Sequence, residues 1–261
     1  MAETPSGWYE WYRIIVEDFG YSVEKDSEAS SILASQMNDR PCLIPSLRRL
    51  VSGRGTVVVA GASDSIDEEA KQLLELGHRD KYVIFSADSA TGALLEAGLT
   101  PDIVVTDMDG KMEELLDAWS RGAVLIIHAH GDNIPKVADI GKLFNERIEA
   151  TCQSEPKGHI HNFGGFTDGD RAVFIAAGLG ATKIITIGMC LTCRIGQRSK
   201  KSKNITQEWL KAKKKKLSYA QKLLSWLTTI RPEIEFIDAT TNNNPPSGIK
   251  KKQLNIVIRN L

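Results

Sequence analysis

The sequence predicts an α/β fold in which a mostly parallel sheet carries helices on both faces, preceded by an N-terminal helical segment. Short apolar runs that end in small or polar residues recur from Thr56 onward. Stretches with a helical spacing of apolar residues separate these runs, whereas the first 51 residues contain no such run. Because strands that alternate with helices join through right-handed crossovers, the pattern indicates parallel strands that are covered on both sides.

The composition is typical of a globular protein. The chain has 261 residues, of which 42% are hydrophobic and 25% charged, so it can bury a full core in one or two domains. Its four cysteines make no disulfide framework, and no basic and apolar leader precedes them. No apolar stretch approaches the roughly 20 residues that cross a bilayer. We therefore expect a cytoplasmic protein in a reducing environment that neither spans nor enters a membrane.

Residues 1–51 are expected to be helical, because apolar side chains recur there at the spacing of one helix face. We divide the chain into this N-terminal helical subdomain, 1–51, and an α/β domain, 52–261, which contains a basic flap or helix at 194–222. The apolar residues of the two N-terminal stretches are Trp8, Trp11, Ile14, Ile15 and Phe19, followed by Ala29, Ile32, Leu33 and Met37.

Five apolar runs predict buried strands, since short continuous runs bounded by turn residues are typical of parallel sheets. Helices are expected between them. The predicted strands cover residues 56–60, 82–86, 102–106, 123–128 and 183–188, and the predicted helices cover 66–76, 91–97, 111–119, 135–144 and 170–177.

The residues that follow the predicted strands are the candidates for a site, because ligands bind beyond the carboxyl ends of parallel strands. Asp107 and Asp109 follow the third strand and precede Gly110, whose missing Cβ allows the backbone to turn. Carboxylates this close repel each other unless a cation neutralises them, and Mg²⁺ is commonly held by one or two carboxylates plus phosphates and water. The alternative is an Asp that caps the helix starting near Lys111.

Two earlier strand ends also carry polar groups. Gly61 and Ser63 lie between a strand and a helix, where backbone amides can bind an anion. The alternative is that Ser63 or Ser65 caps this helix together with Glu68. Asp88 follows the second strand and, at face value, caps a helix.

The fourth predicted strand ends in HAHGDN (128–133). We expect the side chains of His128 and His130 to point to opposite faces, and therefore to hydrogen-bond to phosphate or substrate rather than to hold zinc. A buried core histidine is the alternative for His128. Asp132 adds a third carboxylate near the predicted cation site.

A glycine-rich turn, GGFTDGDR (164–171), opens a later helix. Thr167 is a candidate N-cap, and acids in the first turn of a helix are favoured by the helix dipole. The functional alternative assigns Asp170 to the cation site or to a polar substrate. It assigns Arg171 to a phosphate, which a guanidinium can bind through two hydrogen bonds.

The net charge of zero conceals a basic segment. Residues 194–222 contain 11 Lys and Arg and a single acid, which leaves 22 basic and 32 acidic residues in the remainder of the chain. Such a run is commonly a solvated helix face, and the alternative is a flap that closes over a triphosphate and excludes water. Nucleic-acid binding would use the same charges, but few aromatic residues interleave them. The CxxC sequence from Cys190 to Cys193 has no second pair, so we expect no zinc there and an incidental role.

In combination, these motifs resemble the archaeal 6-hydroxymethyl-7,8-dihydropterin diphosphokinases, which are similar to the catalytic domain of thiamin diphosphokinases. The resemblance rests on PDIVVTDMDG (101–110), HAHGDN (128–133) and GGFTDGDRA (164–172), and it extends from the region 8–21 to the lysine-bearing helix. Each motif alone is weak, whereas their succession is specific. One position departs from the family pattern, because Cys190 stands where the family commonly has Asp.

The resemblance implies a thiamin-diphosphokinase-like fold and a Mg²⁺-dependent transfer of diphosphate from ATP to the hydroxymethyl group of the pterin, with release of AMP, in folate or tetrahydromethanopterin biosynthesis. It assigns Asp107, Asp109 and Asp132 to the metal and the phosphates. Independently of the resemblance, a carboxylate such as Asp109 or Asp132 can accept the proton of the attacking hydroxyl. The expected partners are small molecules, not nucleic acid or membrane, and a homodimer is left open. Nucleotide or pterin contacts are implied for Gly61, Ser63, Asp88, Thr106, His128, His130, Asn133, Gly164, Gly165, Asp168, Asp170 and Arg171.

Other functions share parts of this pattern. Thiamin or another hydroxymethyl heterocycle could replace the pterin, and metal-dependent nucleotide-sugar transferases also use an Asp-x-Asp motif. A haloacid-dehalogenase-type phosphatase is disfavoured, because its Asp-x-Asp motif normally ends the first strand, whereas two strands precede it here. The sequence contains no P-loop, no dinucleotide fingerprint and no nucleophile elbow.

Overall fold

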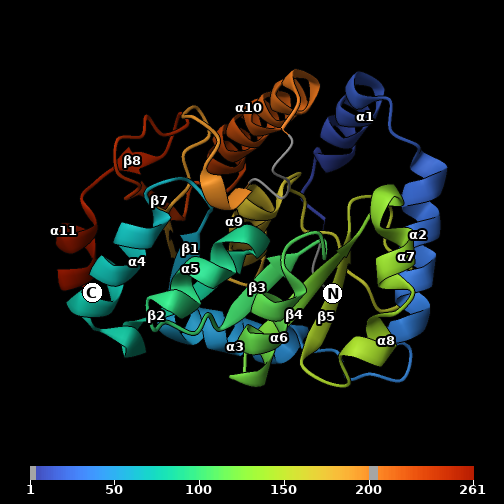
Figure 1. Cartoon of the computed structure of the whole chain (residues 1–261), viewed down its shortest axis with the longest axis horizontal. Helices are drawn as coiled ribbons and strands as arrows, with labels where there is room; N and C mark the ends of the chain where they lie inside the picture. Colours follow the sequence, from blue (N-terminus) through green and yellow to red (C-terminus); the bar gives the residue numbers. More distant parts are fainter. Residues whose placement is uncertain (1–3, 200–204) are drawn as a thin grey trace.

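One sheet of eight parallel strands forms the centre of the protein in the computed structural model, which describes residues 4–199 and 205–261 (Figure 1). The strands are β1 (Thr56–Ala60), β2 (Tyr82–Ala87), β3 (Ile103–Thr106), β4 (Val124–Ala129), β5 (Ile148–Cys152), β6 (Lys183–Ile187), β7 (Glu235–Asp238) and β8 (Lys250–Lys251). Their order in the sheet is β5-β4-β3-β2-β1-β6-β7-β8. The chain therefore reverses its direction of winding between β1 and β6, and such a switch point is where open α/β sheets bind ligands.

The five predicted strands are confirmed to within two residues at each end, and three further strands were not predicted. β5 carries a charged residue, Glu149, among its five residues, and β7 has four residues with charges at both ends. β8 consists of two exposed lysines. None of the three presents the continuous apolar run by which buried strands are recognised.

Helices precede the sheet and connect its strands. The N-terminal helices are α1 (Trp8–Phe19), α2 (Val23–Met37) and α3 (Ile44–Arg54). They are followed by α4 (Ile66–Leu76), α5 (Thr91–Glu96), α6 (Met112–Ser120), α7 (Ile134–Val137), α8 (Ile140–Leu143), α9 (Asp168–Gly178), α10 (Gln207–Ile230) and α11 (Leu254–Arg259), and the 3-10 turns are η1 (Arg79–Lys81), η2 (Asp88–Ala90), η3 (Gly131–Asn133) and η4 (Gln197–Ser199). The predicted helix at 135–144 is instead two single turns, α7 and α8, separated by Ala138 and Asp139. Among the described residues, none of the helices has the length and apolarity that crossing a bilayer requires.

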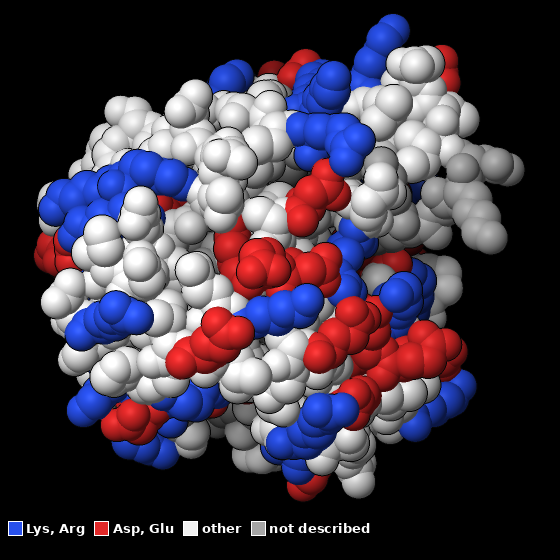
Figure 2. All heavy atoms as spheres, turned by 60° about the vertical axis from the view of Figure 1, so that its left-hand side comes forward, with Lys and Arg blue, Asp and Glu red and all other residues white. Residues whose placement is uncertain are grey.

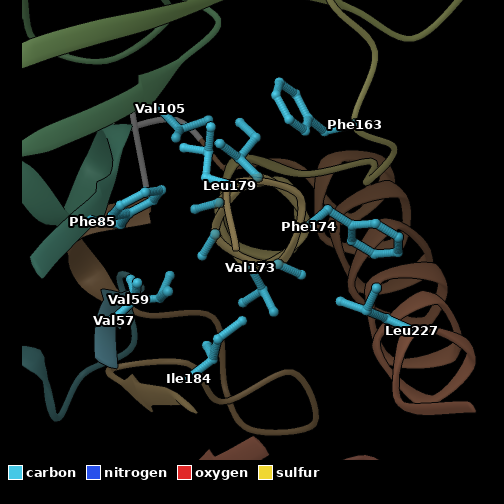
Figure 3. Close-up of a cluster of buried hydrophobic side chains, with 14 of the residues drawn as sticks. Val57, Val59, Phe85, Val105, Phe163, Val173, Phe174, Leu179, Ile184 and Leu227 are labelled. Atoms are coloured by element: carbon cyan, nitrogen blue, oxygen red, sulfur yellow. The ribbon is translucent and has the colours of Figure 1, made fainter. Parts of the chain in front are cut away.

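Helices cover both faces of the sheet, as predicted. Val57, Val59 and Phe85 point to the face that packs against α1, α3, α9 and α10. Figure 3 shows these side chains on one side of α9 and Leu227 of α10 on the other. The intervening residues, such as Val58, point to the opposite face, where α4, α5 and α11 cover the centre of the sheet and α2, α6, α7 and α8 cover the β4 and β5 end.

The N-terminal helices pack into the hydrophobic cores on the two faces of the sheet. Trp8 of α1 is 1% exposed and donates a hydrogen bond from its indole nitrogen to the carbonyl oxygen of Gln153, at 2.9 Å. Trp11 packs against Trp226 of α10, and Figure 1 shows α1 and α10 next to each other. Leu33 of α2 is fully buried in the hydrophobic core that covers the β4 and β5 end of the sheet. The predicted boundary at residue 51 falls inside α3, which continues to Arg54.

Two buried histidines make the stability of this fold depend on pH. Burial lowers the pKa of His128 well below its ordinary value of 6.5, and it also lowers the pKa of His161. The folded state therefore binds protons less tightly than the unfolded state at these sites, and the free energy of unfolding falls as the pH drops below about 6.5.

We expect His128→Asn to flatten the acid-side fall in the free energy of unfolding, because the variant has one buried imidazole fewer to protonate. Urea unfolding at several pH values between about 5 and 7 measures this slope. His159→Asn, which changes an exposed histidine, is the matched control and should keep the wild-type slope. Equal slopes for wild type and His128→Asn would contradict the expectation.

Candidate active site

A cavity of about 280 Å³ lies beyond the carboxyl ends of the strands, next to the switch point between β1 and β6. Its walls come from the segments that follow β1, β2, β3, β4 and β6, from the start of α9, from residues 20–26 and from α10. This position agrees with the rule for ligand sites in open α/β sheets. The predicted site residues that line the cavity are Gly61, Ser63, Asp107, Asp109, His130, Asp132, Asp168 and Arg171.

Four carboxylates meet at this cavity. One oxygen from each of Asp88, Asp107, Asp109 and Asp168 lies within 4.8 Å of the others. Asp107 and Asp109 are predicted metal ligands, whereas Asp132, the third predicted ligand, lines the cavity outside this group. Burial and the charge of Asp107 raise the pKa of Asp168 well above its ordinary value of 3.8. A cation among these oxygens would relieve the repulsion, and an all-oxygen donor set suits a hard divalent cation.

The turn after β3 holds Asp88 in the carboxylate cluster. Oδ2 of Asp88 accepts hydrogen bonds from Oγ1 of Thr106 at 2.5 Å and from the amide of Gly110 at 3.1 Å. Oγ1 of Thr106 in turn accepts a hydrogen bond from the amide of Met108, whose φ of 65° makes the turn. Thr106 is fully buried. Thr106 therefore positions Asp88 and the turn that carries Asp107 and Asp109. Its hydroxyl is not presented to a ligand.

His130 supports Asp107 from the neighbouring loop. Nδ1 of His130 accepts a hydrogen bond from the amide of Asp132 at 3.3 Å. The proton of the neutral ring is therefore on Nε2, which lies 3.4 Å from Oδ2 of Asp107. His130 thus orients a predicted metal ligand.

His128 and His130 lie on the same side of the chain, so the expectation of opposite faces was wrong. Their ring centres are 6.1 Å apart and the planes differ by 29°, because residues two apart in a strand share a face. His128 is 1% exposed, and its Nδ1 lies 3.1 Å from Oγ1 of Thr151, which favours the core-histidine alternative. Asn133 is also buried and donates to the carbonyl oxygens of Asp107 and His128, at 2.9 and 2.7 Å, so it fixes the loop.

The glycine-rich turn before α9 forms a capping box. Asp170 is fully buried and accepts hydrogen bonds from the amides of Phe166 and Thr167, both at 2.7 Å, and from the hydroxyl of Thr167. These contacts favour the capping alternative for Asp170 over a metal or substrate contact. Gly164 and Gly165 both have positive φ, and a Cβ at Gly165 would lie 2.5 Å from the backbone of the next helix turn. The two glycines therefore shape the turn.

The amides of the Gly61–Ser63 turn are already engaged. Those of Gly61 and Ser63 donate to the carbonyl oxygens of Ile187 and Gly188, both at 2.8 Å, and so join the segments that follow β1 and β6. These two amides are not available to an anion, contrary to the expectation. The capping alternative also fails, because Ser65 at the N-cap of α4 makes no side-chain capping bond.

Two cationic side chains face the carboxylates. Arg171 is 4% exposed, and its Nη1 donates to Oδ1 of Asp168 at 3.2 Å while its Nη2 donates to the carbonyl oxygen of Phe166 at 3.0 Å. Lys213 reaches the cavity from α10. Burial lowers the pKa of Lys213 below its ordinary value of 10.5, although the nearby charge of Asp168 opposes this shift. The cavity therefore sets cations opposite its acids, as an anionic ligand bound through a metal requires.

The arginines of the basic segment pair with acidic side chains. Arg194 pairs with Asp64 at 2.9 Å, and Arg198 pairs with Asp67 and Glu96. Figure 2 shows acidic and basic side chains intermixed on the side of the molecule that carries α4. Lys200, Lys201 and Lys203 lie outside the described residues. The two arginines thus form ion pairs, whereas Lys213 and Lys216 line the cavity.

Lys213 and Lys216 are cavity-lining residues that the sequence reasoning missed. The spacing of Lys213 from the apolar residues of the same helix indicates its position. Lys213 precedes Leu217 by four residues and Leu224 by eleven, so it lies on the inward-facing stripe of α10. When residues 211–216 are treated as a single run of charge, the cavity-lining lysines are not distinguished from the exposed ones.

The N-terminal helices supply a wall that no sequence motif indicated. Asp26 of α2 is 3% exposed and lines the cavity. Its Oδ1 accepts a hydrogen bond from the amide of Gly131 at 2.7 Å, and its Oδ2 accepts hydrogen bonds from Tyr12 at 2.8 Å and from Gln153 at 2.7 Å. This network fastens α1 and α2 to the loop that carries His130.

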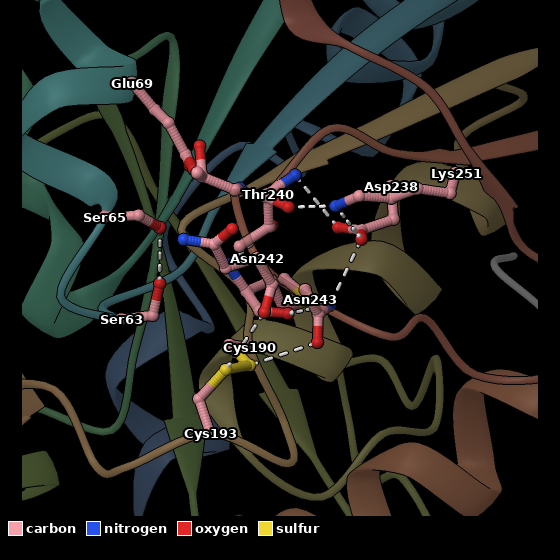
Figure 4. The surroundings of a disulfide bond; sticks show 12 residues. Ser63, Ser65, Glu69, Cys190, Cys193, Asp238, Thr240, Asn242, Asn243 and Lys251 are labelled. Carbon is pink, nitrogen blue, oxygen red and sulfur yellow. Dashed lines mark hydrogen bonds and ion pairs between the residues drawn. A yellow bond between two sulfur atoms is a disulfide. The ribbon is translucent and has the colours of Figure 1, made fainter.

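Cys190 and Cys193 form a disulfide, with Cα atoms 5.4 Å apart (Figure 4). This bond was not expected from the sequence, although the spacing of three residues allows it; the expectation that the pair has an incidental role stays a prediction. Cys190 lines the cavity. Behind it, the side-chain nitrogen of Asn243 donates to the carbonyl oxygen of Met189 and to Asp238, both at 3.1 Å. The bond and this network fix the segment that follows β6.

Comparison with known proteins gives one family. The family model described as "6-hydroxymethylpterin diphosphokinase MptE-like" matches residues 34–195. Three proteins named "6-hydroxymethyl-7,8-dihydropterin pyrophosphokinase" are similar to this chain. The relative from Pyrococcus furiosus is 40% identical over 226 residues, which are 84% of this chain and 94% of the relative. The relative from Methanothermobacter thermautotrophicus is 40% identical over 84% of this chain and 93% of its own, and the relative from Methanocaldococcus jannaschii is 35% identical over 88% and 98%.

A solved structure shares the architecture. The MAf glycosyltransferase from Magnetospirillum magneticum AMB-1 superposes with a TM-score of 0.53 at 17% identity, over 84% of this chain. This chain spans 38% of that structure's length, and at such identity the likeness shows the α/β fold alone. Because the family model and the three relatives cover most of its length, the chain belongs to the MptE-like 6-hydroxymethylpterin diphosphokinase family.

Proposed function

We propose that this protein transfers the diphosphate of ATP to the hydroxymethyl group of 6-hydroxymethyl-7,8-dihydropterin and releases AMP, with Mg²⁺ as the cation. The observation that carries the proposal is the cluster of four carboxylates within 4.8 Å of one another, three of which line the cavity together with Arg171 and Lys213. The names of the relatives support the choice of substrate. We further propose a cytoplasmic role in the biosynthesis of a pterin cofactor.

The donor set fits Mg²⁺, because all four candidate ligands offer carboxylate oxygens and three of them, Asp107, Asp109 and Asp168, line the open cavity. Mg²⁺ bound there would neutralise charge on the transferred phosphates. The residues of the chain do the remaining work by alignment and electrostatics, which dominate phosphoryl transfer. Arg171 is held in place by Asp168 and a backbone carbonyl, so it presents a fixed positive charge.

We propose Asp132 as the group that accepts the proton of the attacking hydroxyl. Asp109 belongs to the carboxylate cluster, where a cation would occupy its lone pairs. Asp132 lines the same cavity outside this cluster and is exposed, so it can meet the hydroxyl directly. Its amide is fixed by His130, which contacts Asp107 on the other side.

The wall formed by residues 20–26 and the turn before α9 suits a flat heterocycle. Tyr21 and Phe166 line the cavity with ring centres 6.3 Å apart, and Lys216 lies 5.7 Å from the centre of each ring. Gln153 and Asp26 add an amide and a carboxylate to the same wall. Aromatic faces next to hydrogen-bonding groups are typical of sites that bind planar polar ring systems.

The assay that tests the proposal measures products. The protein is incubated with Mg²⁺, ATP and 6-hydroxymethyl-7,8-dihydropterin, with thiamin in a parallel reaction, and AMP, ADP and phosphate are separated by chromatography. AMP formed only with the pterin supports the proposal. AMP formed only with thiamin would support diphosphate transfer but would identify thiamin, not the pterin, as the substrate. Folded protein that forms AMP in neither reaction contradicts the proposal.

Asp107→Asn and Asp109→Asn should each lower turnover at least ~100-fold, because each removes charge that stabilises the transferred phosphates. Steady-state AMP formation at saturating Mg²⁺ measures this effect. Asp117→Asn is the control, since Asp117 forms an exposed pair with Arg121 on α6, and it should keep the wild-type rate. Near-wild-type rates in both active-site variants would contradict the metal assignment.

Lys213→Met should lower kcat roughly tenfold or more, because it removes a partly desolvated positive charge that faces the carboxylates. Lys214→Met, which changes the exposed neighbour on α10, should have little effect. The pH profile gives a second readout. Because the pKa of Lys213 is lowered, wild-type kcat should fall as the pH rises towards the lysine range, and Lys213→Arg should move this fall to higher pH. Identical alkaline limbs in the two proteins would count against a catalytic charge on Lys213.

A further inference from the structure

A second group of metal-binding side chains lies away from the cavity. Cys42 belongs to the connection between α2 and α3, and Glu149 is the second residue of β5. His161 belongs to the segment after β5, which returns to form an isolated bridge with Thr151. Their ligand atoms lie within 4.8 Å of one another. Three segments that are distant in the sequence thus place a thiol, a carboxylate and an imidazole together.

The thiol and the carboxylate both lie close to one nitrogen of the histidine ring. Sγ of Cys42 lies 3.8 Å from Nε2 of His161, and Oε1 of Glu149 lies 3.9 Å from the same Nε2. In a catalytic relay, the nucleophile and the carboxylate contact different nitrogens of the histidine ring. Here both face one nitrogen. This arrangement is the one in which three ligands surround a cation.

The spacing fits a tetrahedral transition metal. Zinc bonds of about 2.0 to 2.3 Å at tetrahedral angles place neighbouring ligand atoms about 3.3 to 3.7 Å apart. The observed separations of 3.8 and 3.9 Å are only slightly longer. Small side-chain rotations would close the difference, and a set of one sulfur, one nitrogen and one oxygen ligand suits zinc rather than Mg²⁺.

The surroundings hold these ligands in place. Glu149 is 1% exposed, and its Oε2 accepts a hydrogen bond from the amide of Leu43 at 2.8 Å while its Oε1 accepts one from Ala150 at 3.0 Å. Within residues 4–199 and 205–261, no Lys or Arg forms an ion pair with Glu149. A buried carboxylate without a cationic side chain is compatible with a bound metal.

We propose that Cys42, Glu149 and His161 bind one zinc ion, with the fourth position open to water because Cys42 is exposed. The site would tie the connection between the N-terminal helices to β5 at the edge of the sheet. It is separate from the carboxylate cluster, since Glu149 lies near the start of its strand and the cavity lies beyond the strand ends. We assign the site a structural role, because its ligands join three segments that are distant in the sequence.

Cobalt substitution tests the proposal directly. The tag-free full-length chain is stripped of metal with a chelator and titrated with Co²⁺ in the presence of excess Mg²⁺, which occupies all-oxygen sites. We expect a thiolate-to-cobalt charge-transfer band that saturates at one equivalent and disappears when Zn²⁺ is added. Zinc should also raise the Tm of the stripped protein, because a ligand that binds the folded state stabilises it.

Cys42→Ser carries the test, because the residue is exposed and the change is small enough to preserve the fold, which circular dichroism checks. This variant should lose the charge-transfer band, bind zinc at least ~10-fold more weakly and show a smaller rise in Tm. The double variant Cys190→Ser with Cys193→Ser is the matched control and should keep the band. A folded wild-type protein without the band would overturn the proposal. A band that survives in Cys42→Ser but is lost in the control would also overturn it.

Discussion

Repulsion among the four carboxylates of Asp88, Asp107, Asp109 and Asp168 is the interaction on which the site depends. Their oxygens lie within 4.8 Å of one another, and burial together with the charge of Asp107 raises the pKa of Asp168. The fold brings them together because β2 and β3 end at one edge of the sheet, where α9 begins with Asp168. Arg171 and a cation would compensate part of this charge, and an incoming polyphosphate would share the cation.

Several contacts of the fold position the aspartates of this cluster. Thr106 and the turn at Met108 fix Asp88, and His130 fixes Asp107. The N-terminal helices reach the same loop through Asp26. Because they are packed into the cores of the sheet, α1 and α2 form a permanent wall of the cavity. The chain therefore builds its site from the strand ends and closes it with helices from both ends of the sequence.

The sequence predicted the parts of the structure that have a local signal. Five strands were recognised from continuous apolar runs, and the acidic turn at 107–110 was recognised from its place after a strand. β8, with two exposed lysines, has no such signal and exists because β7 offers it an edge. Asp170 and Asn133 belong to motifs that look functional, yet their hydrogen bonds go to neighbouring backbone. Which polar residue is structural was decided by tertiary contacts.

The contribution of Lys213 shows the same limit. The sequence shows that Lys213 lies on the same side of the helix as Leu217 and Leu224, but its proximity to Asp168 depends on how α10 packs across α9.

The most direct test of the carboxylate site is anomalous diffraction from crystals grown with Mn²⁺ and a non-hydrolysable ATP analogue. We expect a manganese peak among Asp88, Asp107, Asp109 and Asp168, with the phosphates between it and Lys213. A manganese peak elsewhere in the cavity, or phosphates bound without these aspartates, would contradict this expectation.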